Sequence, residues 1–299
     1  MKIIYGINSI AKLHRPVVAL GVFDGLHLGH RKILQATVKK ADQIKGTSVV
    51  LTFFPHPQKK ESLYSLEHRL RLISELGVAV CIVVNFTKSF KKISGLDFIA
   101  KILVGKIRAN FVYVGRNFRF GNNASGDYRL LALAARKYKF RLKVFNVIKS
   151  AKRIVSSTAI RKLIKNSKII MAQKLLGRRV SILGTVTRGS RLGRLLGFPT
   201  ANIKAHHEVI PPTGIYAVKI VFAHHEYNGV CYIGKRPTFN FKHNALRIEV
   251  HLFNFHKNIY GEVLEIQFIK LIRLDQKFAS PADLSAQIRK DIQVCRKVL

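Results

Sequence analysis

Acidic residues are scarce in this sequence: 15 Asp and Glu face 53 Lys and Arg over 299 residues, a formal net charge of +38. Hydrophobic residues nevertheless make up 48% of the chain, and the mean hydropathy is slightly positive. A disordered basic tail combines high charge with low hydrophobicity, so that class of protein is excluded. A chain of this length folds into one large domain or two ordinary ones, each with its own core.

Cysteines are few, and long apolar runs are missing. Cys81, Cys231 and Cys295 are odd in number and share no close spacing. A disulfide framework or a cysteine zinc site is therefore not expected, and a reducing cytoplasm fits best. The longest apolar run, 78–84, is too short to span a bilayer, so no membrane partner is expected. The apolar stretch 16–22 lacks a small-residue cleavage site, which argues against a signal peptide.

The positive charge is unevenly distributed, with 36 basic and 7 acidic residues in 1–180 against 17 and 8 in 181–299. Such an excess first suggests a polyanionic partner, and a basic nucleic-acid-binding protein is one hypothesis for it. Trp is absent, and no helix-turn-helix, RNA-recognition or zinc signature occurs. We therefore expect no specific nucleic-acid partner. The sequence does not determine the oligomeric state, and a homo-oligomer is among the alternatives.

The first half of the chain alternates between two patterns. Apolar, β-rich runs predict strands at 17–22, 48–54, 78–84, 111–114 and 142–148. Helical patterns lie between them at 28–44, 66–76, 96–107 and 128–138. This alternation predicts βαβ units, a mostly parallel sheet and the α/β class, with ligands beyond the carboxyl ends of the strands.

The second half changes character near 178–181. Short strands with turn signals are predicted at 181–187, 201–204, 215–222, 230–233, 246–253 and 263–272, and a closing helix begins at Pro281. Six strands and one helix suggest a small six-stranded antiparallel β-barrel with a C-terminal helix. The sequence therefore predicts two domains of different class, 1–180 and 181–299.

The motif G-V-F-D-G-L-H-L-G-H at 21–30 follows the first strand and opens the first helix. His27 and His30 are three residues apart and share one face of the first helical turn. A helix N-terminus offers free N–H groups and a positive dipole end, which suit phosphate, and the glycines allow close approach. A turn with two surface histidines is the simpler alternative. A metal pair is less favoured, because no third ligand sits at a characteristic spacing.

Three further stretches end predicted strands: T-F-F-P-H-P at 52–57, V-G-R-N-F-R-F-G at 114–121 and V-S-S-T-A-I-R at 155–161. Taken singly, they are a rigid loop, a basic loop, and a helix cap with a solvated arginine. Taken together and in this order, they form a specific pattern.

A second candidate site lies in the barrel half. Glycine-rich segments occur at 184–189 and at Gly193, followed by G-F-P-T-A-N at 197–202; Ser190 stands where a Walker A motif has Lys. Glycine-rich loops wrap phosphate with backbone N–H groups. Thr200 and Asn202 supply oxygen donors suited to Mg²⁺. A hairpin loop and a proline turn are the simpler alternative.

The segment R-I-E-V-H-L-F at 247–253 alternates with period two, so Arg247, Glu249 and His251 share one face. A half-exposed strand with an Arg–Glu pair explains this pattern. The sharper hypothesis makes Glu249 a base that faces a substrate pocket.

The first half resembles the FMN adenylyltransferase domain of bacterial bifunctional riboflavin kinase/FAD synthetases, a Rossmann-like H-x-G-H nucleotidyltransferase. The resemblance rests on G-x-F-D-G-x-H-x-G-H, T-F-x-P-H-P, G-x-[DN]-F-x-F-G and S-S-T-x-I-R, in this order. It implies that His27 and His30 hold the ATP phosphates and the transition state. The nucleotide-binding residues that it implies are Gly21, Phe23, Asp24, Gly25, Gly29, Ser157, Thr158 and Arg161. The flavin-binding residues that it implies are Pro55, His56, Asn117 and Phe118, and Arg116 departs from the family's usual residue type.

The second half resembles the riboflavin kinase domain of the same family. The resemblance rests on G-F-P-T-A-N, with P-T-F at 237–239, I-E-V-H at 248–251, Y-G at 260–261, K-F at 277–278 and Asp291 in the expected order. It implies that Thr200 and Asn202 coordinate Mg²⁺ and the ATP phosphates, and that Glu249 is the catalytic base. Further nucleotide-binding residues that it implies are Gly184, Gly189, Gly197 and Pro199.

The resemblance implies a bifunctional enzyme whose substrates are ATP, riboflavin and FMN. Its kinase converts riboflavin to FMN, and its adenylyltransferase converts FMN to FAD. An H-x-G-H transferase for another acceptor, such as pantetheine phosphate or nicotinate mononucleotide, is the alternative within enzymes. That alternative leaves the barrel motifs unexplained.

Overall fold

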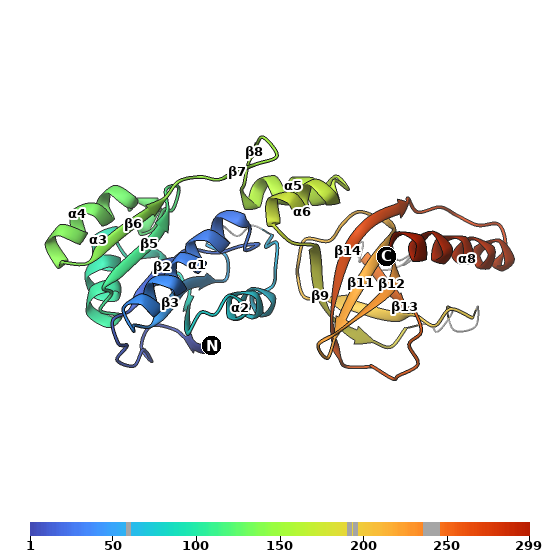
Figure 1. Cartoon of the computed structure of the whole chain (residues 1–299), viewed down its shortest axis with the longest axis horizontal. Coiled ribbons are helices and arrows are strands. Elements are labelled where there is room, and N and C mark those ends of the chain that lie inside the picture. The colour runs from blue at the N-terminus through green and yellow to red at the C-terminus, as the bar shows by residue number, and fades with distance from the viewer. Residues whose placement is uncertain (58–60, 190–192, 194–196, 236–245) are drawn as a thin grey trace. The chain divides into compact units, whose positions relative to one another are not determined.

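A computed structural model (Figure 1) describes residues 1–57, 61–189, 193, 197–235 and 246–299. The predicted P-T-F motif at 237–239 lies outside the described residues. The chain forms two compact units: Met1–Ser62 with Leu66–Ser157, and Leu63–Ser65 with Thr158–Leu299. The assignment of the two activities to 1–180 and 181–299 stays a prediction.

A six-stranded parallel sheet forms the centre of the N-terminal unit, in the order β1-β4-β3-β2-β5-β6. All five predicted strands of this half are confirmed. The strand β1 was missed, because a four-residue edge strand with three exposed positions carries little alternation. The strands are β1 (Lys2–Tyr5), β2 (Val17–Leu20), β3 (Ser48–Phe54), β4 (Val80–Asn85), β5 (Phe111–Gly115) and β6 (Arg141–Phe145).

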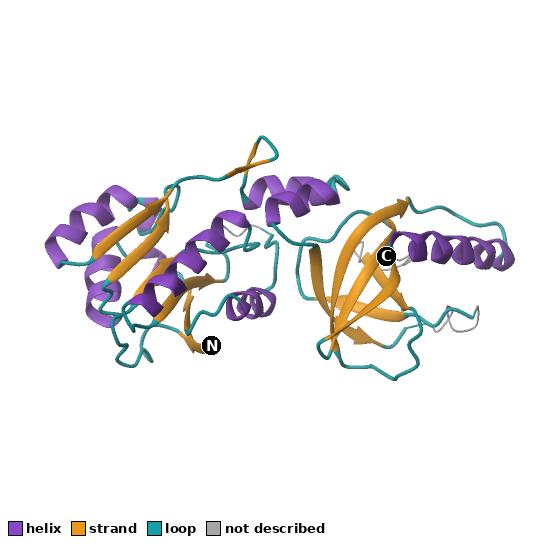
Figure 2. Ribbon diagram, in the orientation of Figure 1, coloured by secondary structure: helices purple, strands orange, loops and turns teal. Residues whose placement is uncertain are grey.

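Helices cover both faces of this sheet (Figure 2). Alternate residues of β2 enter different cores: Val17 and Ala19 pack with α1 and α2, whereas Val18 and Leu20 pack with η2 and α4. The predicted helix at 96–107 is a short α-turn continued by a π-helix. The helices are α1 (Leu28–Gln43), α2 (Leu66–Glu75), η1 (Phe90–Lys92), α3 (Gly95–Asp97), η2 (Phe98–Lys106), η3 (Asn122–Ala124) and α4 (Tyr128–Tyr138), and a small hairpin of β7 (Lys149–Ser150) and β8 (Arg153–Ile154) follows β6.

A closed antiparallel barrel forms the centre of the C-terminal unit, in the order β10-β13-β12-β11-β14-β9. The six predicted strands and the predicted closing helix are confirmed. The barrel strands are β9 (Val180–Thr187), β10 (Ala201–Ala205), β11 (Gly214–Phe222), β12 (His225–Lys235), β13 (Leu246–Leu252) and β14 (Val263–Arg273). The helices are α5 (Ser157–Lys165), α6 (Ile169–Leu176) and α8 (Pro281–Val298).

Two segments outside the barrel strands complete this unit. The helix α6 packs on it, and Gln173 Nε2 donates to the carbonyl of Phe268 at 2.8 Å. The buried carboxylate of Glu208 accepts from the backbone N–H of Ser65 at 2.9 Å. Tyr64, also buried, lies under the Arg178 guanidinium at 4.9 Å. Residues 63–65 are therefore a built-in part of the C-terminal unit. Among the described helices, none is long and apolar enough to cross a membrane.

Candidate functional site

The predicted first site lies where three neighbouring parallel strands end. The strands β3, β2 and β5 are adjacent, and each is followed by one of the predicted motifs. Since the carboxyl ends of parallel strands share one edge, the fold brings the loops after 20, 54 and 115 to that edge. The structure thus brings together the predicted histidine and flavin loops within the N-terminal unit.

The loop between β2 and α1 is sharply bent and tightly packed. Phe23, Gly25 and Leu26 all have positive φ values, of 52°, 80° and 40°. A Cβ on Gly21 would lie 2.9 Å from the Phe23 ring, so only glycine fits there. The buried Phe23 ring in turn meets the His30 ring edge-on at 5.3 Å. This packing supports the imidazole of His30 from behind.

His27 and His30 form a pair at the start of α1. Their rings are stacked, with centroids 3.7 Å apart and planes 18° apart. His27 caps the helix, since its Nδ1 accepts from the backbone N–H of His30 at 3.4 Å. A Cβ on Gly29 would lie 3.3 Å from the His27 ring, which explains the glycine between them. Both imidazoles therefore stand at a helix N-terminus, where an anion is favoured.

Side chains from three other segments fasten this loop. The hydroxyl of Thr52 and Nη1 of Arg69 donate to the carbonyl of Val22, at 2.9 and 2.7 Å. The hydroxyl of Ser157 donates to the carbonyl of Asp24 at 2.7 Å. The S-S-T motif therefore anchors the loop through its second serine. Thr158 and Arg161 follow on α5, and their contacts with phosphate stay predictions.

The predicted flavin-binding residues differ in solvent exposure. Pro55 and Asn117 are exposed and His56 is half-buried, and the Phe54–Pro55 peptide is cis. Phe118 packs against the core and stacks on Phe120 at 5.8 Å, which gives it a structural role. Flavin binding by these residues stays a prediction.

Arg116, the departure from the family pattern, turns to a neighbouring helix. Its guanidinium lies 5.3 Å from the Tyr128 ring centre, and its Nη1 donates to Asn146 Oδ1 at 3.5 Å. Arg129 and then Arg116 lower the pKa of the Tyr128 hydroxyl. The side chain of Arg116 thus has structural contacts of its own.

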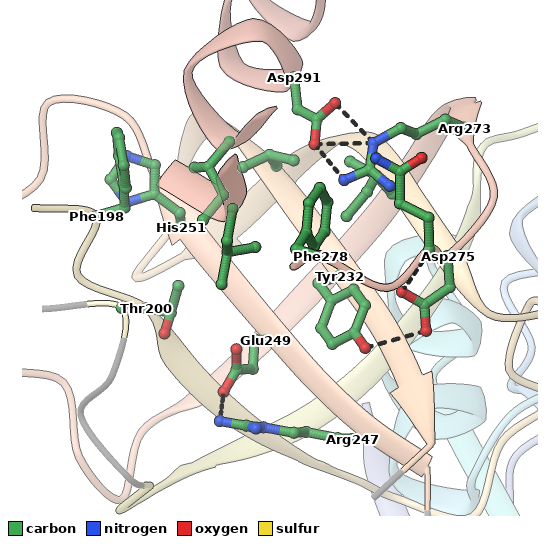
Figure 3. A pocket seen from close by; sticks show the side chains of 16 residues that line it. Phe198, Thr200, Tyr232, Arg247, Glu249, His251, Arg273, Asp275, Phe278 and Asp291 are labelled. Atoms are coloured by element: carbon green, nitrogen blue, oxygen red, sulfur yellow. Dashed lines mark hydrogen bonds and ion pairs between the residues drawn. The ribbon is translucent and has the colours of Figure 1, made fainter. Parts of the chain in front are cut away.

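A pocket of about 300 Å³ opens in the barrel unit (Figure 3). It brings together two predicted residues, Thr200 and Glu249, which lie at one end of the pocket in the figure. Asn202 pairs in register with Glu249 across β10 and β13, and cross-strand partners share a face. The structure therefore gathers a hydroxyl, an amide and a carboxylate, although Asn202 does not line the pocket itself.

Glu249 has a partner on its own strand. Its side chain is 16% exposed and forms an ion pair with Arg247, two residues earlier on the same face of β13. Across β12, the Tyr232 hydroxyl donates to Asp275 Oδ2 at 3.2 Å. Burial, with smaller contributions from Asp275 and Glu249, raises the pKa of Tyr232 to about 12. The Tyr232 side chain therefore carries a neutral hydroxyl, and Tyr232 is the cross-strand neighbour of Glu249.

The opposite end of the pocket is closed by a buried ion pair. Asp291 of α8 accepts from Nε and Nη2 of Arg273 at 2.9 and 2.8 Å, and from Gln287 at 2.9 Å. The guanidinium of Arg273 also lies over the Phe278 ring at 5.7 Å. This network fastens the segment after β14 to α8. Of these residues, the sequence motifs indicated only Phe278 and Asp291.

The glycines of the barrel half have different roles. A Cβ on Gly189 would lie 2.0 Å from Asn202 Nδ2, and a Cβ on Gly193 would lie 2.6 Å from the Phe198 carbonyl oxygen and 3.0 Å from Thr200 Oγ1. These two glycines make room for the predicted oxygen donors. Gly184 is instead buried within β9, where a Cβ would lie 2.3 Å from Ile203 Cγ2. Packing therefore explains why residue 184 is a glycine. Nucleotide binding by Gly184, Gly197 and Pro199 stays a prediction.

The oxygen donors at this pocket suit a hard cation that takes its remaining ligands from water and phosphate. Within the described ranges, no group of three His, Cys, Asp or Glu could hold a metal by itself. Mg²⁺ usually takes one or two protein oxygens and completes its shell with water and phosphate. Thr200, Asn202 and Glu249 fit that pattern.

Comparisons with known proteins identify a family for each half of the chain. Residues 9–159 match the FAD synthetase family, and 176–299 match the riboflavin kinase family. The chain is 35% identical to a bifunctional riboflavin kinase/FMN adenylyltransferase of Buchnera aphidicola subsp. Schizaphis graminum, over 99% of this chain and 98% of that protein. A Bacillus subtilis protein of the same name is 36% identical, over 93% and 91%. A crystal structure described as a macrolide-efflux protein from Streptococcus pneumoniae superposes with a TM-score of 0.86, at 27% identity over 99% of both chains.

Proposed function

This chain belongs to the bifunctional riboflavin kinase/FMN adenylyltransferase family, and on that premise we propose which residues perform each of its two reactions. The enzyme transfers phosphate from ATP to riboflavin, and an adenylyl group from ATP to FMN. The pocket that joins Thr200 to Glu249 carries the kinase assignment. The stacked His27 and His30 at a helix N-terminus carry the adenylyltransferase assignment.

In the kinase reaction, the nucleophile is a neutral hydroxyl of the ribityl chain. A neutral alcohol attacks poorly, so a carboxylate that accepts its proton assists the step. Glu249 is that base: the new bond joins the ribityl oxygen to the γ-phosphorus, and the bond to the ADP oxygen breaks. Apolar side chains such as Phe198, Ile215 and Phe278 line the same pocket and suit the flavin ring.

Mg²⁺ is the divalent ion that this pocket fits best. Thr200, just before β10, and Asn202, on β10, would hold it through their side-chain oxygens. When bound, such an ion neutralises charge on the phosphates of ATP. Gly189 supports this assignment, since a larger residue there would displace the Asn202 side chain.

In the adenylyl transfer, the nucleophile is already an anion. The phosphate of FMN attacks the α-phosphorus of ATP, the bond to pyrophosphate breaks, and no proton needs to be removed. The protein must therefore align the two phosphates and offset their negative charge. His27 and His30 donate to phosphate oxygens at the N-terminus of α1. Ser157, Thr158 and Arg161 add donors, and Asn117, Pro55 and His56 contact the flavin.

The experiment that tests this function is a flavin product analysis. Full-length protein is incubated with riboflavin, ATP and Mg²⁺, and flavins are separated over time; FMN is expected first and FAD second. Pantetheine phosphate and nicotinate mononucleotide serve as alternative acceptors, and neither should be adenylylated. Adenylylation of either one, without FAD formation, would overturn the assignment.

We propose the cytoplasm as the compartment, on the basis of the cysteines. All three cysteines are free and buried. Free thiols are typical of a reducing compartment, which supports the cytoplasm.

A further inference from the structure

A buried arginine lies behind the adenylyltransferase site, where the proposed function does not use it. Arg69 is on α2 and only 2% exposed, which is rare for this residue type. Burial lowers the pKa of its guanidinium, and the charge of the buried Asp24 acts in the opposite direction. A cation is thus held inside the N-terminal unit, next to the loop that carries His27 and His30.

The contacts of Arg69 reach two of the active-site segments. Its Nη1 donates to the carbonyl of Val22 at 2.7 Å, just before the strained turn at Phe23. Its Nη2 donates to the carbonyl of Phe53 at 3.5 Å, just before the exposed Phe54 and Pro55. The Thr52 hydroxyl donates to the same Val22 carbonyl at 2.9 Å. One guanidinium therefore connects the end of β3 to the loop after β2.

We propose that Arg69 is a positioning residue for adenylyl transfer. Its forked donors hold the histidine loop and the base of the flavin loop at a fixed separation, and its buried charge offsets the negative charge that builds up when the two phosphates meet in the transition state. This inference rests on the proposed adenylyltransferase site. It adds a residue that touches neither substrate.

Simple packing does not explain a buried guanidinium at this position. A buried cation is costly, and an apolar side chain of similar volume would stabilise the core at least as well. Only a guanidinium presents several donors in a fixed fork, so Lys can hold one of the two carbonyls but not both. A charge inside the protein is also poorly screened and acts on the reacting phosphates at longer range than a surface charge.

The test uses the full-length chain and compares Arg69→Lys, Arg69→Met and a matched control, Arg71→Met. Arg71 lies on the same helix, is exposed, and forms an ion pair with Glu75 one turn further along. FAD formation from FMN and ATP gives kcat and KM, and riboflavin phosphorylation in the same sample reports on the other unit. We expect Arg69→Met to lower kcat for FAD formation by about 10- to 100-fold, with Arg69→Lys in between. KM for ATP and the kinase rate should change less than about twofold, as should all parameters in Arg71→Met.

A purely structural role would give a different result. Activity per folded molecule, with the folded fraction taken from thermal unfolding, would then stay within about twofold of the parent for both Arg69 variants, and this would overturn the proposal. Should Arg69→Met not fold, Arg69→Lys decides alone: it can hold only one of the two carbonyls, so an unchanged kcat per folded molecule in that variant would overturn the proposal too. His30→Ala separates the two hypotheses: if that variant still makes FAD, the proposed site itself is wrong, whereas unchanged Arg69 variants beside an inactive His30→Ala refute only this inference.

Discussion

Replacing Glu249 by Gln tests the proposed kinase mechanism most directly. Gln has the same shape as Glu, so the wall of the pocket should keep its packing. The change removes the ion pair with Arg247, but that guanidinium is 31% exposed and keeps access to water. We therefore expect a change of less than about 1 kcal/mol in the free energy of unfolding. The proton acceptor, in contrast, is lost completely.

General-base catalysis is worth about 10²- to 10⁴-fold in rate, which corresponds to about 2.7–5.4 kcal/mol in the activation free energy. FMN formation from riboflavin should fall by that factor in Glu249→Gln. FAD formation from supplied FMN should stay at the parent rate, because that reaction needs no base. The two rates are measured by separating flavins after incubation with ATP and Mg²⁺.

Glu262→Gln provides the matched control, since this glutamate is exposed and lies outside the pocket. It should leave both rates unchanged. If Glu249→Gln phosphorylates riboflavin as fast as the parent, Glu249 is not the base. If it loses both activities while folded, the two reactions do not use separate residues.

Four further changes have expected outcomes. His30→Ala should lower FAD formation by about 100-fold, because it removes a donor to the phosphates, while the kinase rate in the same sample stays unchanged; equal loss of both would contradict this. Thr200→Val should raise the Mg²⁺ concentration for half-maximal kinase activity by roughly tenfold, measured by Mg²⁺ titration, and an unchanged midpoint would remove Thr200 from the metal site. Asp291→Asn should lower the free energy of unfolding by on the order of 3 kcal/mol in denaturant titrations, since it leaves the largely buried Arg273 without its charge partner. Gly184→Ala should cost about 1–3 kcal/mol in the same assay, because its Cβ would overlap a β10 side chain, and a stable variant would show that β10 can move away.

The fold was largely predictable because its signals are local. Alternating apolar runs and helical periodicity predicted five of the six sheet strands and all six barrel strands. The predictions failed where local signals are weak, as at β1 and at α6, which the sequence did not indicate. The π-helical geometry of Phe98–Lys106 was also missed, because helical periodicity does not distinguish an α-helix from a π-helix.

The candidate site could be predicted only in part. Thr200 and Glu249 were found because their strands carry recognisable motifs. The Tyr232–Asp275 and Arg273–Asp291 pairs were missed as pairs, since their partners come from different elements and only the closed barrel brings them together. Arg69 was missed for the same reason: on a helix with the pattern L-E-H-R-L-R, nothing marks it as buried.

Residues 63–65 have a consequence for cutting the chain into parts. A fragment that begins at 158 or at 181 contains Glu208 but not the backbone N–H of Ser65, so a buried carboxylate oxygen loses its donor. In the fragment that begins at 158, the loss of the buried Tyr64 ring also leaves a void beneath Arg178. A gene fragment that encodes only the residues from 158 onward therefore encodes an incomplete core. The two activities can be separated by point mutation more cleanly than by scission of the polypeptide.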